Sequence, residues 1–424
     1  MNDKKPLASA SAGKTAGKKP RRRIRIHLRK KKHDTETMAR FSESRAYYER
    51  NADRFHLLRT LSALLLAAVI ILSGFMSYGF LVDNQFRYLY KAWKINPVSL
   101  GKQYHDISYA AGNGASFTMY KNDLAVIESD KITVYDVSGD RRFRAEAPNV
   151  SAKQAFAVSG KYVALYTPGD KRFAIYDSFS SVYEHTFAYP IRLAAVSDSG
   201  KFAVCLREEE RIVIEVYDSN AAKAMTVKLD KNTVVYDLDL SPNGDKLAIT
   251  TIEGGDAFGA GNYYTDFSLW DVSSEKKIVS ERIMGKRPIA TSFLDNMRMY
   301  FACEGSVMFF QTGGKKIRTV TAPAQYMIAS DGKTVAVSDG TSLVSVYSAK
   351  GEEKAEFALT EKILGLKTGS GCCYTFSNKS VSVYDGDGEK KGTYEIRSGA
   401  LDFFPLSDGS ILVCYVSETK RIVP

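Results

Sequence analysis

The chain has 424 residues and a formal net charge of +11, a balance that by itself would suggest a nucleic-acid-binding protein. The charge is unevenly placed, because residues 1–59 hold 18 Lys and Arg against 6 Asp and Glu, whereas the remainder holds 41 against 42. The large C-terminal part is therefore nearly neutral, which excludes the basic footprint of a nucleic-acid-binding domain. The 5 cysteines show no Cys-x-x-Cys spacing, so neither a zinc site nor a redox motif is predicted.

Residues 1–33 are predicted to form a disordered basic tail, since they have little apolar surface to bury. We predict that their cations contact anionic lipid head groups. The alternatives are that they only set the orientation of the chain in a membrane, or that they bind nucleic acid non-specifically. Nucleic acid is the least favoured partner, because no aromatic side chain is interleaved for base stacking. The predicted lipid-contacting residues are Arg21, Arg22, Arg23, Arg25, Arg29, Lys30, Lys31 and Lys32.

A membrane span is predicted next in the chain. Residues 34–59 contain neither Pro nor Gly and predict a juxtamembrane helix. Residues 60–82 contain no Asp, Glu, Lys, Arg or His, and as a helix they reach roughly 35 Å, enough to cross the ~30 Å core of a bilayer. Because basic flanks stay in the cytoplasm, we predict an uncleaved anchor in the cell membrane, with a cytoplasmic N-terminus and an extracellular C-terminal domain. Residues 83–101, rich in aromatics and cations, predict an interfacial tether.

From residue 102 to residue 424 a unit recurs: a turn, an alternating apolar strand, a second turn, and a strand that ends in an aromatic residue often followed by Asp. The aromatic positions are spaced by 41, 41, 53, 40, 37 and 37 residues. A period near 40 in short strands is typical of the four-stranded blades of a β-propeller. The sequence therefore predicts an all-β fold, a β-propeller over 102–424. The aromatic positions are Tyr135, Tyr176, Tyr217, Trp270, Phe310, Tyr347 and Tyr384.

The last unit is incomplete, and this determines the predicted number of blades. After Tyr384 the segments ALDFFPL, SILVCYV and KRIVP make a partial unit that lacks one strand. We expect the missing strand to come from the start of the domain, between Lys102 and Tyr109. Such closure leaves no free sheet edge. Eight blades are predicted, and seven is the alternative if the last unit is not a full blade.

The blade endings, such as ITVYD, IEVYD and SLWD, resemble those of WD-repeat and quinoprotein-like propellers. The layout of basic tail, single anchor and propeller is also similar to that of an uncharacterised family of single-pass membrane proteins from clostridia and related Gram-positive bacteria. The resemblance covers most of the chain and implies an architecture and a location, but it supplies no catalytic residues. The Asp after the aromatic is absent at Phe310 and Tyr347, so the WD-type hydrogen-bond set is degenerate here.

Few residues point to catalysis. Of the 5 histidines, only His105 and His185 follow the anchor, too few for a three-histidine zinc site. Nucleophile-elbow, zinc-protease, P-loop and dinucleotide-binding motifs are missing from the sequence. We therefore predict no catalytic residue, metal or cofactor, while a carboxylate-based enzyme stays open because its residues would be dispersed along the chain. The run 385–389, DGDGE, lacks the EF-hand spacing and predicts a hairpin turn.

One unit is longer than its neighbours. The spacing from Tyr217 to Trp270 is 53, and the excess lies between residues 252 and 267, in EGGDAFGAGNYYTD. Exposed aromatics on a loop are often recognition residues, although an ordinary tolerated insertion is the alternative. The acidic turn EEER occupies the corresponding place in the preceding unit, and we expect the two groups to meet if this face is used. The predicted binding residues are Phe258, Tyr263, Tyr264, Glu208, Glu209 and Arg211.

These observations favour a binding or scaffold module, held outside the membrane, for a protein, a peptide or an envelope glycan. Two alternatives are kept. The first is a transmembrane sensor whose tail responds to a ligand outside. The second is an enzyme that uses a quinone cofactor or carboxylates.

Overall fold

The structure is a computed structural model of the 424-residue chain. It separates into two units, Met1–Gly79 and Phe80–Pro424, which are treated one at a time below. The predicted basic tail, the tether and the centre of the insertion lie outside the described residues. The residues that the structure describes are 43–47, 49–82, 104–109, 115–120, 123–148, 154–177, 180–254 and 263–423.

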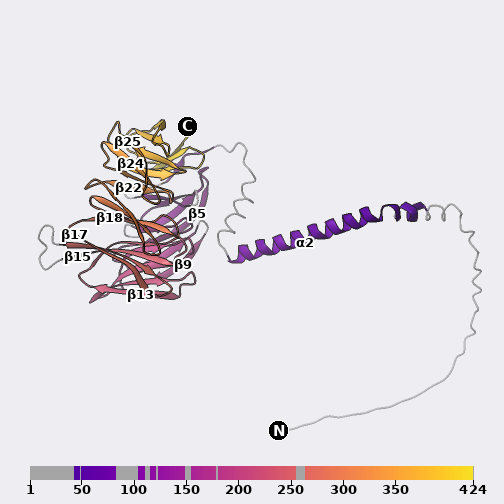
Figure 1. Ribbon diagram of the computed structural model, residues 1–424, viewed down its shortest axis with the longest axis horizontal. Coiled ribbons are helices and arrows are strands. Elements are labelled where there is room, and N and C mark those ends of the chain that lie inside the picture. The colour runs from indigo at the N-terminus through magenta and orange to yellow at the C-terminus, as the bar shows by residue number, and fades with distance from the viewer. Residues whose placement is uncertain are drawn as a thin grey trace, which may run out of the picture. The chain divides into compact units, whose positions relative to one another are not determined.

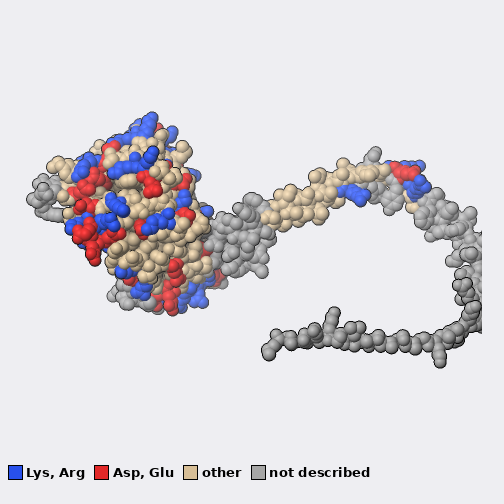
Figure 2. Space-filling model, turned by 90° about the horizontal axis from the view of Figure 1, so that it is seen from below, with Lys and Arg blue, Asp and Glu red and all other residues tan. Residues whose placement is uncertain are grey.

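The helix α2, Ala52–Val82, lies in the first unit except for its last three residues, and it includes all of the predicted span. Its stretch His56–Gly74 is apolar enough and long enough to cross a membrane, and none of that stretch is buried within the chain. Charged side chains gather at its N-terminal end (Figure 2). A helix that is apolar on every side needs an apolar surrounding, and none is supplied by the described part of this chain.

The second unit is a β-propeller of 32 strands in eight antiparallel, four-stranded sheets, as the repeats predict (Figure 1). The first blade consists of β2 (Ser116–Tyr120), β3 (Asp123–Ile127), β4 (Lys131–Tyr135) and β5 (Arg141–Glu146), and the second of β6 (Ala155–Val158), β7 (Val163–Tyr166), β8 (Arg172–Tyr176) and β9 (Ser181–Thr186). The third blade consists of β10 (Ile191–Val196), β11 (Phe202–Arg207), β12 (Arg211–Tyr217) and β13 (Lys223–Asp230). The fourth consists of β14 (Val234–Leu240), β15 (Lys246–Gly254), β16 (Tyr263–Asp271) and β17 (Lys276–Met284).

The next three blades follow the same order, and the eighth combines both ends of the propeller. The fifth blade consists of β18 (Pro288–Phe293), β19 (Arg298–Cys303), β20 (Ser306–Gln311) and β21 (Lys316–Thr321), and the sixth of β22 (Met327–Ser330), β23 (Thr334–Ser338), β24 (Leu343–Ser348) and β25 (Glu353–Ala358). The seventh blade consists of β26 (Gly365–Gly369), β27 (Cys372–Phe376), β28 (Ser380–Tyr384) and β29 (Lys390–Glu395). The eighth consists of β30 (Asp402–Pro405), β31 (Ile411–Cys414), β32 (Glu418–Ile422) and β1 (Ile107–Ser108). Numbering the blades in this order, from 1 to 8, places the predicted insertion in blade 4.

The ring closes through the strand that the sequence predicts. In blade 8, β1 pairs with β32 in the register Ile107↔Thr419 and Ser108↔Glu418. The Tyr109 hydroxyl donates to the carbonyl oxygen of Tyr415 at 2.7 Å and lies 2.8 Å from that of Glu418. Both the closure and the count of eight blades are therefore confirmed.

The core lies between the blades rather than within one of them. Each interface between neighbouring blades holds one cluster of buried apolar side chains in the described residues, eight in all. Between blades 3 and 4, for example, Ile214 and Val216 pack with Leu247 and Ile249. The alternation of the strands explains this arrangement, because each sheet is apolar on both faces where it meets its neighbours.

The repeated aromatic residues mark a β-bulge in each of the first seven blades. The pairing of the third strand with the fourth shifts at the aromatic residue, as at Tyr217. The Asp that follows caps the next turn: Oδ1 of Asp218 accepts from the N–H groups of Asn220 at 2.9 Å and Ala222 at 2.8 Å. Where the Asp is absent in blade 6, the Ser348 hydroxyl accepts two turn N–H groups instead. The Asp is therefore a turn cap, which a hydroxyl can replace.

The propeller has two loop faces. The turn face holds the turns between first and second strands and between third and fourth strands: residues 136–140, 159–162, 197–201, 218–222, 241–245, 272–275, 294–297, 312–315, 331–333, 349–352, 370–371, 385–389 and 406–410. The connection face holds the loops between second and third strands and the blade-to-blade connections: residues 128–130, 147–148, 167–171, 187–190, 208–210, 231–233, 285–287, 304–305, 322–326, 339–342, 359–364, 377–379, 396–401 and 415–417.

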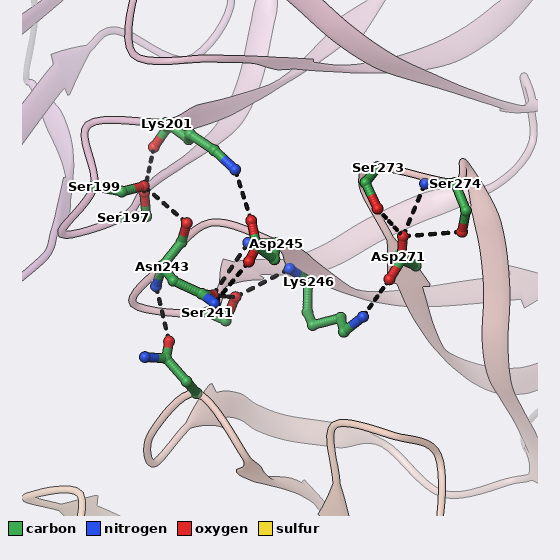
Figure 3. Close-up of polar contacts among 11 residues, drawn as sticks. Ser197, Ser199, Lys201, Ser241, Asn243, Asp245, Lys246, Asp271, Ser273 and Ser274 are labelled. Atoms are coloured by element: carbon green, nitrogen blue, oxygen red, sulfur yellow. Dashed lines mark hydrogen bonds and ion pairs between the residues drawn. The ribbon is translucent and has the colours of Figure 1, made fainter.

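Hydrogen bonds join the turn face from blade to blade. The Ser199 hydroxyl donates to the carbonyl oxygen of Asn243 at 3.0 Å, and the Asn243 N–H donates to Oδ1 of Asn296 at 2.8 Å (Figure 3). Lys201 and Asp245 form an ion pair at 2.7 Å between the same turns of blades 3 and 4. The polar groups of these turns are thus largely used within the protein.

Candidate functional site

Exposed apolar side chains concentrate on the connection face. Twelve large apolar residues of the described propeller are exposed, and eight of them lie on this face or at the adjoining strand ends. Met284, at the end of β17, is 61% exposed. The eight are Tyr189, Val234, Tyr236, Met284, Leu343, Leu364, Leu401 and Val416, and the other four are Tyr104, Val182, Met297 and Val423. This uneven distribution makes the connection face the candidate interaction surface.

The insertion extends this face. The strands β15, β16 and β17 have 9 residues each, and the register continues to Glu253↔Tyr264 and Gly254↔Tyr263. Blade 4 therefore projects beyond its neighbours (Figure 1). The sequence places all of 252–267 in a loop, whereas the structure uses both ends of it as strand, because the residues from Tyr263 onward continue the alternation of β16. Phe258 lies outside the described residues.

The two predicted tyrosines point to opposite sides of blade 4. Tyr263 shares its side of β16 with Phe267, which packs against blade 5. Tyr264 shares the other side with Trp270, which packs against blade 3. Adjacent residues in a strand always divide in this way, so the tyrosines cannot act as one pair. On the blade 3 side, the Arg282 guanidinium lies 4.3 Å from the centre of the Tyr264 ring.

Charged groups surround Tyr264. Arg282 donates to Oε2 of Glu253 at 3.0 Å, and its Nε lies 3.8 Å from Oδ1 of Asp266. The other carboxylate oxygen of Asp266 is buried and has no hydrogen-bond partner in the described residues. Burial raises the pKa of Asp266, and the neighbouring Arg282 opposes that rise. This cluster presents a cation, an aromatic ring and carboxylates together, which suits contacts with a polypeptide.

The acidic turn of blade 3 forms its own ion pairs. Glu208 pairs with Arg211, and Glu210 pairs with Lys231 at 2.7 Å. Among the residues that the structure describes, no hydrogen bond or ion pair joins this turn to Tyr264. Both groups lie on the connection face, as predicted, but they do not contact each other. Glu209 is exposed beside them.

A cavity that the sequence does not indicate lies between blades 3 and 4 on this face. Its volume is about 320 Å³. Arg192 and Arg207 line it together with Lys231, over apolar side chains that include Leu193 and Val235. These residues come from several strands, so no spacing in the sequence could reveal them.

Buried charges near the central channel have structural partners. Asp237 and Asp239, on β14, accept the N–H groups of Thr291 at 2.8 Å and Phe293 at 2.9 Å, on β18 of the next blade. Burial raises the pKa of Asp239 to about 7, and the accepted N–H bonds oppose that rise. These carboxylates therefore join the inner strands of two neighbouring blades.

Another cavity, of about 730 Å³, lies at the turn face, where the inner strands β2, β22, β26 and β30 end. Lys367 lines it and forms an ion pair with Asp402 at 2.7 Å. Burial lowers the pKa of Lys367, and the Asp402 carboxylate opposes that change.

In the part of the chain that the structure describes, no group of three or more His, Cys, Asp and Glu side chains could hold a metal. All 5 cysteines are free thiols, and Cys205, Cys303, Cys373 and Cys414 are buried.

Comparison with known proteins places this propeller in a family. The model of a family of unknown function, DUF5711, matches residues 101–423. The chain belongs to the DUF5711 family. The match covers the whole described propeller and agrees with the predicted membership of an uncharacterised family. No curated protein matches the sequence of this DUF5711 protein.

Solved structures share the fold of this DUF5711 propeller. BamB from Moraxella catarrhalis is similar with a TM-score of 0.51 at 11% identity, over 75% of this chain and 98% of that one. The C-terminal WD40 domain of Sif2 gives a TM-score of 0.54 at 11% identity, over 76% and 98%. At such identity the likeness shows the fold alone, and it confirms the predicted likeness to WD-repeat propellers.

Proposed function

We propose that this DUF5711 protein is a membrane-anchored binding module whose connection face holds a partner protein, peptide or envelope glycan outside the cell. The observation that carries the proposal is the concentration of exposed apolar side chains on that face, beside the projecting blade 4. Apolar surface left in water is unfavourable, and covering it with a partner recovers that free energy.

The anchor is α2. Its apolar stretch suits a bilayer by length and composition. The basic residues Arg21, Arg22, Arg23, Arg25, Arg29, Lys30, Lys31 and Lys32 precede it, which favours a cytoplasmic N-terminus near anionic lipid. The propeller would then lie in the extracellular space, and four of its five unpaired cysteines, all except Cys372, are buried, where oxidants have little access.

Met284 and Met297 offer a matched test, because they are the same residue type on the two faces, 61% and 72% exposed. We expect Met284→Glu to reduce the capture of the extracellular partner strongly in crosslinking on intact cells, because it places a charge in the apolar contact. We expect Met297→Glu to leave capture unchanged. Circular dichroism should match the wild type in both variants, since both side chains are exposed.

The opposite result would refute the proposal: capture that survives Met284→Glu but is lost in Met297→Glu would assign binding to the turn face. A crosslinked band that neither variant alters would also count against the connection face. Tyr264→Ala provides a second variant of the same surface, and it should lower capture less than Met284→Glu because its ring is already covered by Arg282.

A further inference from the structure

The cavity between blades 3 and 4 has a positively charged entrance. Arg192 lies at the start of β10 and Arg207 at the end of β11, on paired strands, and the Arg207 N–H donates to the carbonyl oxygen of Pro190 at 3.0 Å. The pairing of β10 with β11 shifts between Ile191 and Leu193, so a bulge sits at Arg192. This geometry holds two guanidinium-bearing residues on neighbouring strands at one cavity.

Neither guanidinium has an anionic partner among the residues that the structure describes. In the described residues, Arg192 and Arg207 make no ion pair and no side-chain hydrogen bond. Nearby cations differ in this respect, since Arg211 pairs with Glu208 and Lys231 pairs with Glu210. Two neighbouring guanidinium groups without a counter-charge repel each other and attract an anion, and their planar donors suit a carboxylate.

The rest of the cavity is apolar. Leu193, Ile212 and Val235 line it, and Val234 at its rim is 56% exposed. The volume of about 320 Å³ equals roughly ten water molecules at ~30 Å³ each, which suits a small group rather than a folded domain. A ligand that fits must therefore combine an anionic group with an apolar side chain of modest size.

We infer that this cavity binds a carboxylate of a partner polypeptide, with Arg192 and Arg207 holding the carboxylate and the apolar wall receiving the neighbouring side chain. The inference rests on the proposed function and gives it a ligand class. Inorganic phosphate is a poorer fit, because it has no apolar part that the wall of Leu193, Ile212 and Val235 could receive. A carboxylate can be a chain terminus or an acidic side chain, and the test separates the two.

The probes are peptides labelled at the amino end with a neutral fluorophore that has no carboxylate, and the protein is the full chain in lipid nanodiscs. The first probe is glycyl-glycyl-leucine with a free carboxyl end, the second is its C-terminal amide, and the third is the amide of glycyl-aspartyl-leucine. We expect anisotropy to show binding of the first or the third and not of the second. The probe that binds identifies the carboxylate as a terminus or a side chain.

The variants then assign the binding to the arginines. Arg192→Gln and Arg207→Gln should each weaken the bound probe about tenfold or more, as loss of a charge-assisted hydrogen bond does. Arg287→Gln is the control, since Arg287 is 62% exposed on the same face but pairs with Glu304 and lies outside the cavity. Glu209→Gln should tighten binding slightly because it removes a nearby negative charge.

Three results would overturn the inference: equal binding of the amide, unchanged binding in both arginine variants, or displacement of the peptide by an equal concentration of inorganic phosphate. The outcome is separable from the proposed function. If Met284→Glu abolishes partner capture while Arg192→Gln has no effect on peptide binding, the connection face binds a partner by other residues, and only the carboxylate pocket is wrong.

Discussion

The protonation of one residue, Asp239, makes the stability of the propeller depend on pH. Its carboxylate accepts the N–H groups of Phe293 and Leu240, each at 2.9 Å, and burial raises its pKa to about 7. An unfolded Asp titrates near pKa ~3.9. Between about pH 4 and pH 7 the folded state therefore binds more protons than the unfolded state, and the free energy of unfolding falls as pH rises through this window.

Asp239→Asn should remove this dependence, because an amide cannot ionise. From pH 5 to pH 8 we expect the stability of the variant, measured by chemical denaturation, to improve relative to the wild type by roughly 2–3 kcal/mol. The variant loses one acceptor oxygen at every pH, so it starts less stable at pH 5. Asp387→Asn, at an exposed turn, is the control and should leave the pH profile unchanged. Parallel profiles for wild type and Asp239→Asn would show that Asp239 keeps an ordinary titration.

The residues of the repeats explain why the fold could be predicted. Tyr217 and Asp218 recur in kind because an aromatic side chain packed at the bulge and a capping side chain in the turn are needed in nearly every blade. Such local requirements leave a periodic trace in sequence. The exchange of Asp for Ser348 in blade 6 weakens the motif without altering the turn, since a hydroxyl also accepts the turn N–H groups.

At the scale of elements, the weakest joint of the ring is its closure. The outer strand β1 has 2 residues, whereas the outer strands of the other blades have 6 or more in the described residues. Tyr109 reinforces this short strand: its hydroxyl lies within 3.1 Å of the carbonyl oxygens of Tyr415 and Glu418 and of the Thr419 hydroxyl. One buried side chain thus reinforces a joint in which the strand ladder is short.

Tyr109→Phe should therefore destabilise the propeller by about 1–3 kcal/mol, because it leaves buried acceptors without a donor. The measurement is the free energy of unfolding from urea or guanidinium titration. Tyr189→Phe is the matched control, since Tyr189 is 39% exposed and its hydroxyl has no hydrogen-bond partner in the described residues. A loss of equal size in both variants would mean that the Tyr109 hydroxyl does not hold the closure.

The elements also show where prediction from sequence fails. The excess residues of blade 4 were visible in the spacing, but their use as strand was not, because Gly-rich sequence suggests a loop. The opposite directions of Tyr263 and Tyr264 follow from strand alternation once the strand is known. Arg192 and Arg207 gave no signal at all, since the cavity arises from pairing between strands and from the next blade.

At the scale of the whole molecule, the propeller and the N-terminal part of the chain differ in net charge. The propeller carries both signs interspersed over its visible surface (Figure 2), which suits solubility without strong attraction to a lipid surface. The excess of positive charge lies in the first 59 residues. A neutral propeller and a basic tail are the combination expected if only the tail contacts anionic lipid. The orientation of the chain in the membrane is therefore the property to test.

The eight Arg and Lys residues between positions 21 and 32 make the positive charge of the two flanks of the helix unequal. Residues 40–59 hold 5 Lys and Arg, and residues 83–102 hold 4, so the near flanks are almost balanced. Orientation follows the excess of Lys and Arg on the cytoplasmic side. We therefore predict that replacing Arg21, Arg22, Arg23, Arg25, Arg29, Lys30, Lys31 and Lys32 by Gln gives a mixture of orientations, whereas the wild type has one.

The measurement is protease accessibility on intact cells with a tag at each end of the chain. In the wild type we expect the C-terminal tag to be digested and the N-terminal tag to be protected. The Gln variant should show partial protection of both tags, and a variant with Lys at all eight positions should behave as the wild type does, because it keeps the charge. Protection of the propeller in the wild type would place it in the cytoplasm, and it would then meet a cytoplasmic partner on its connection face.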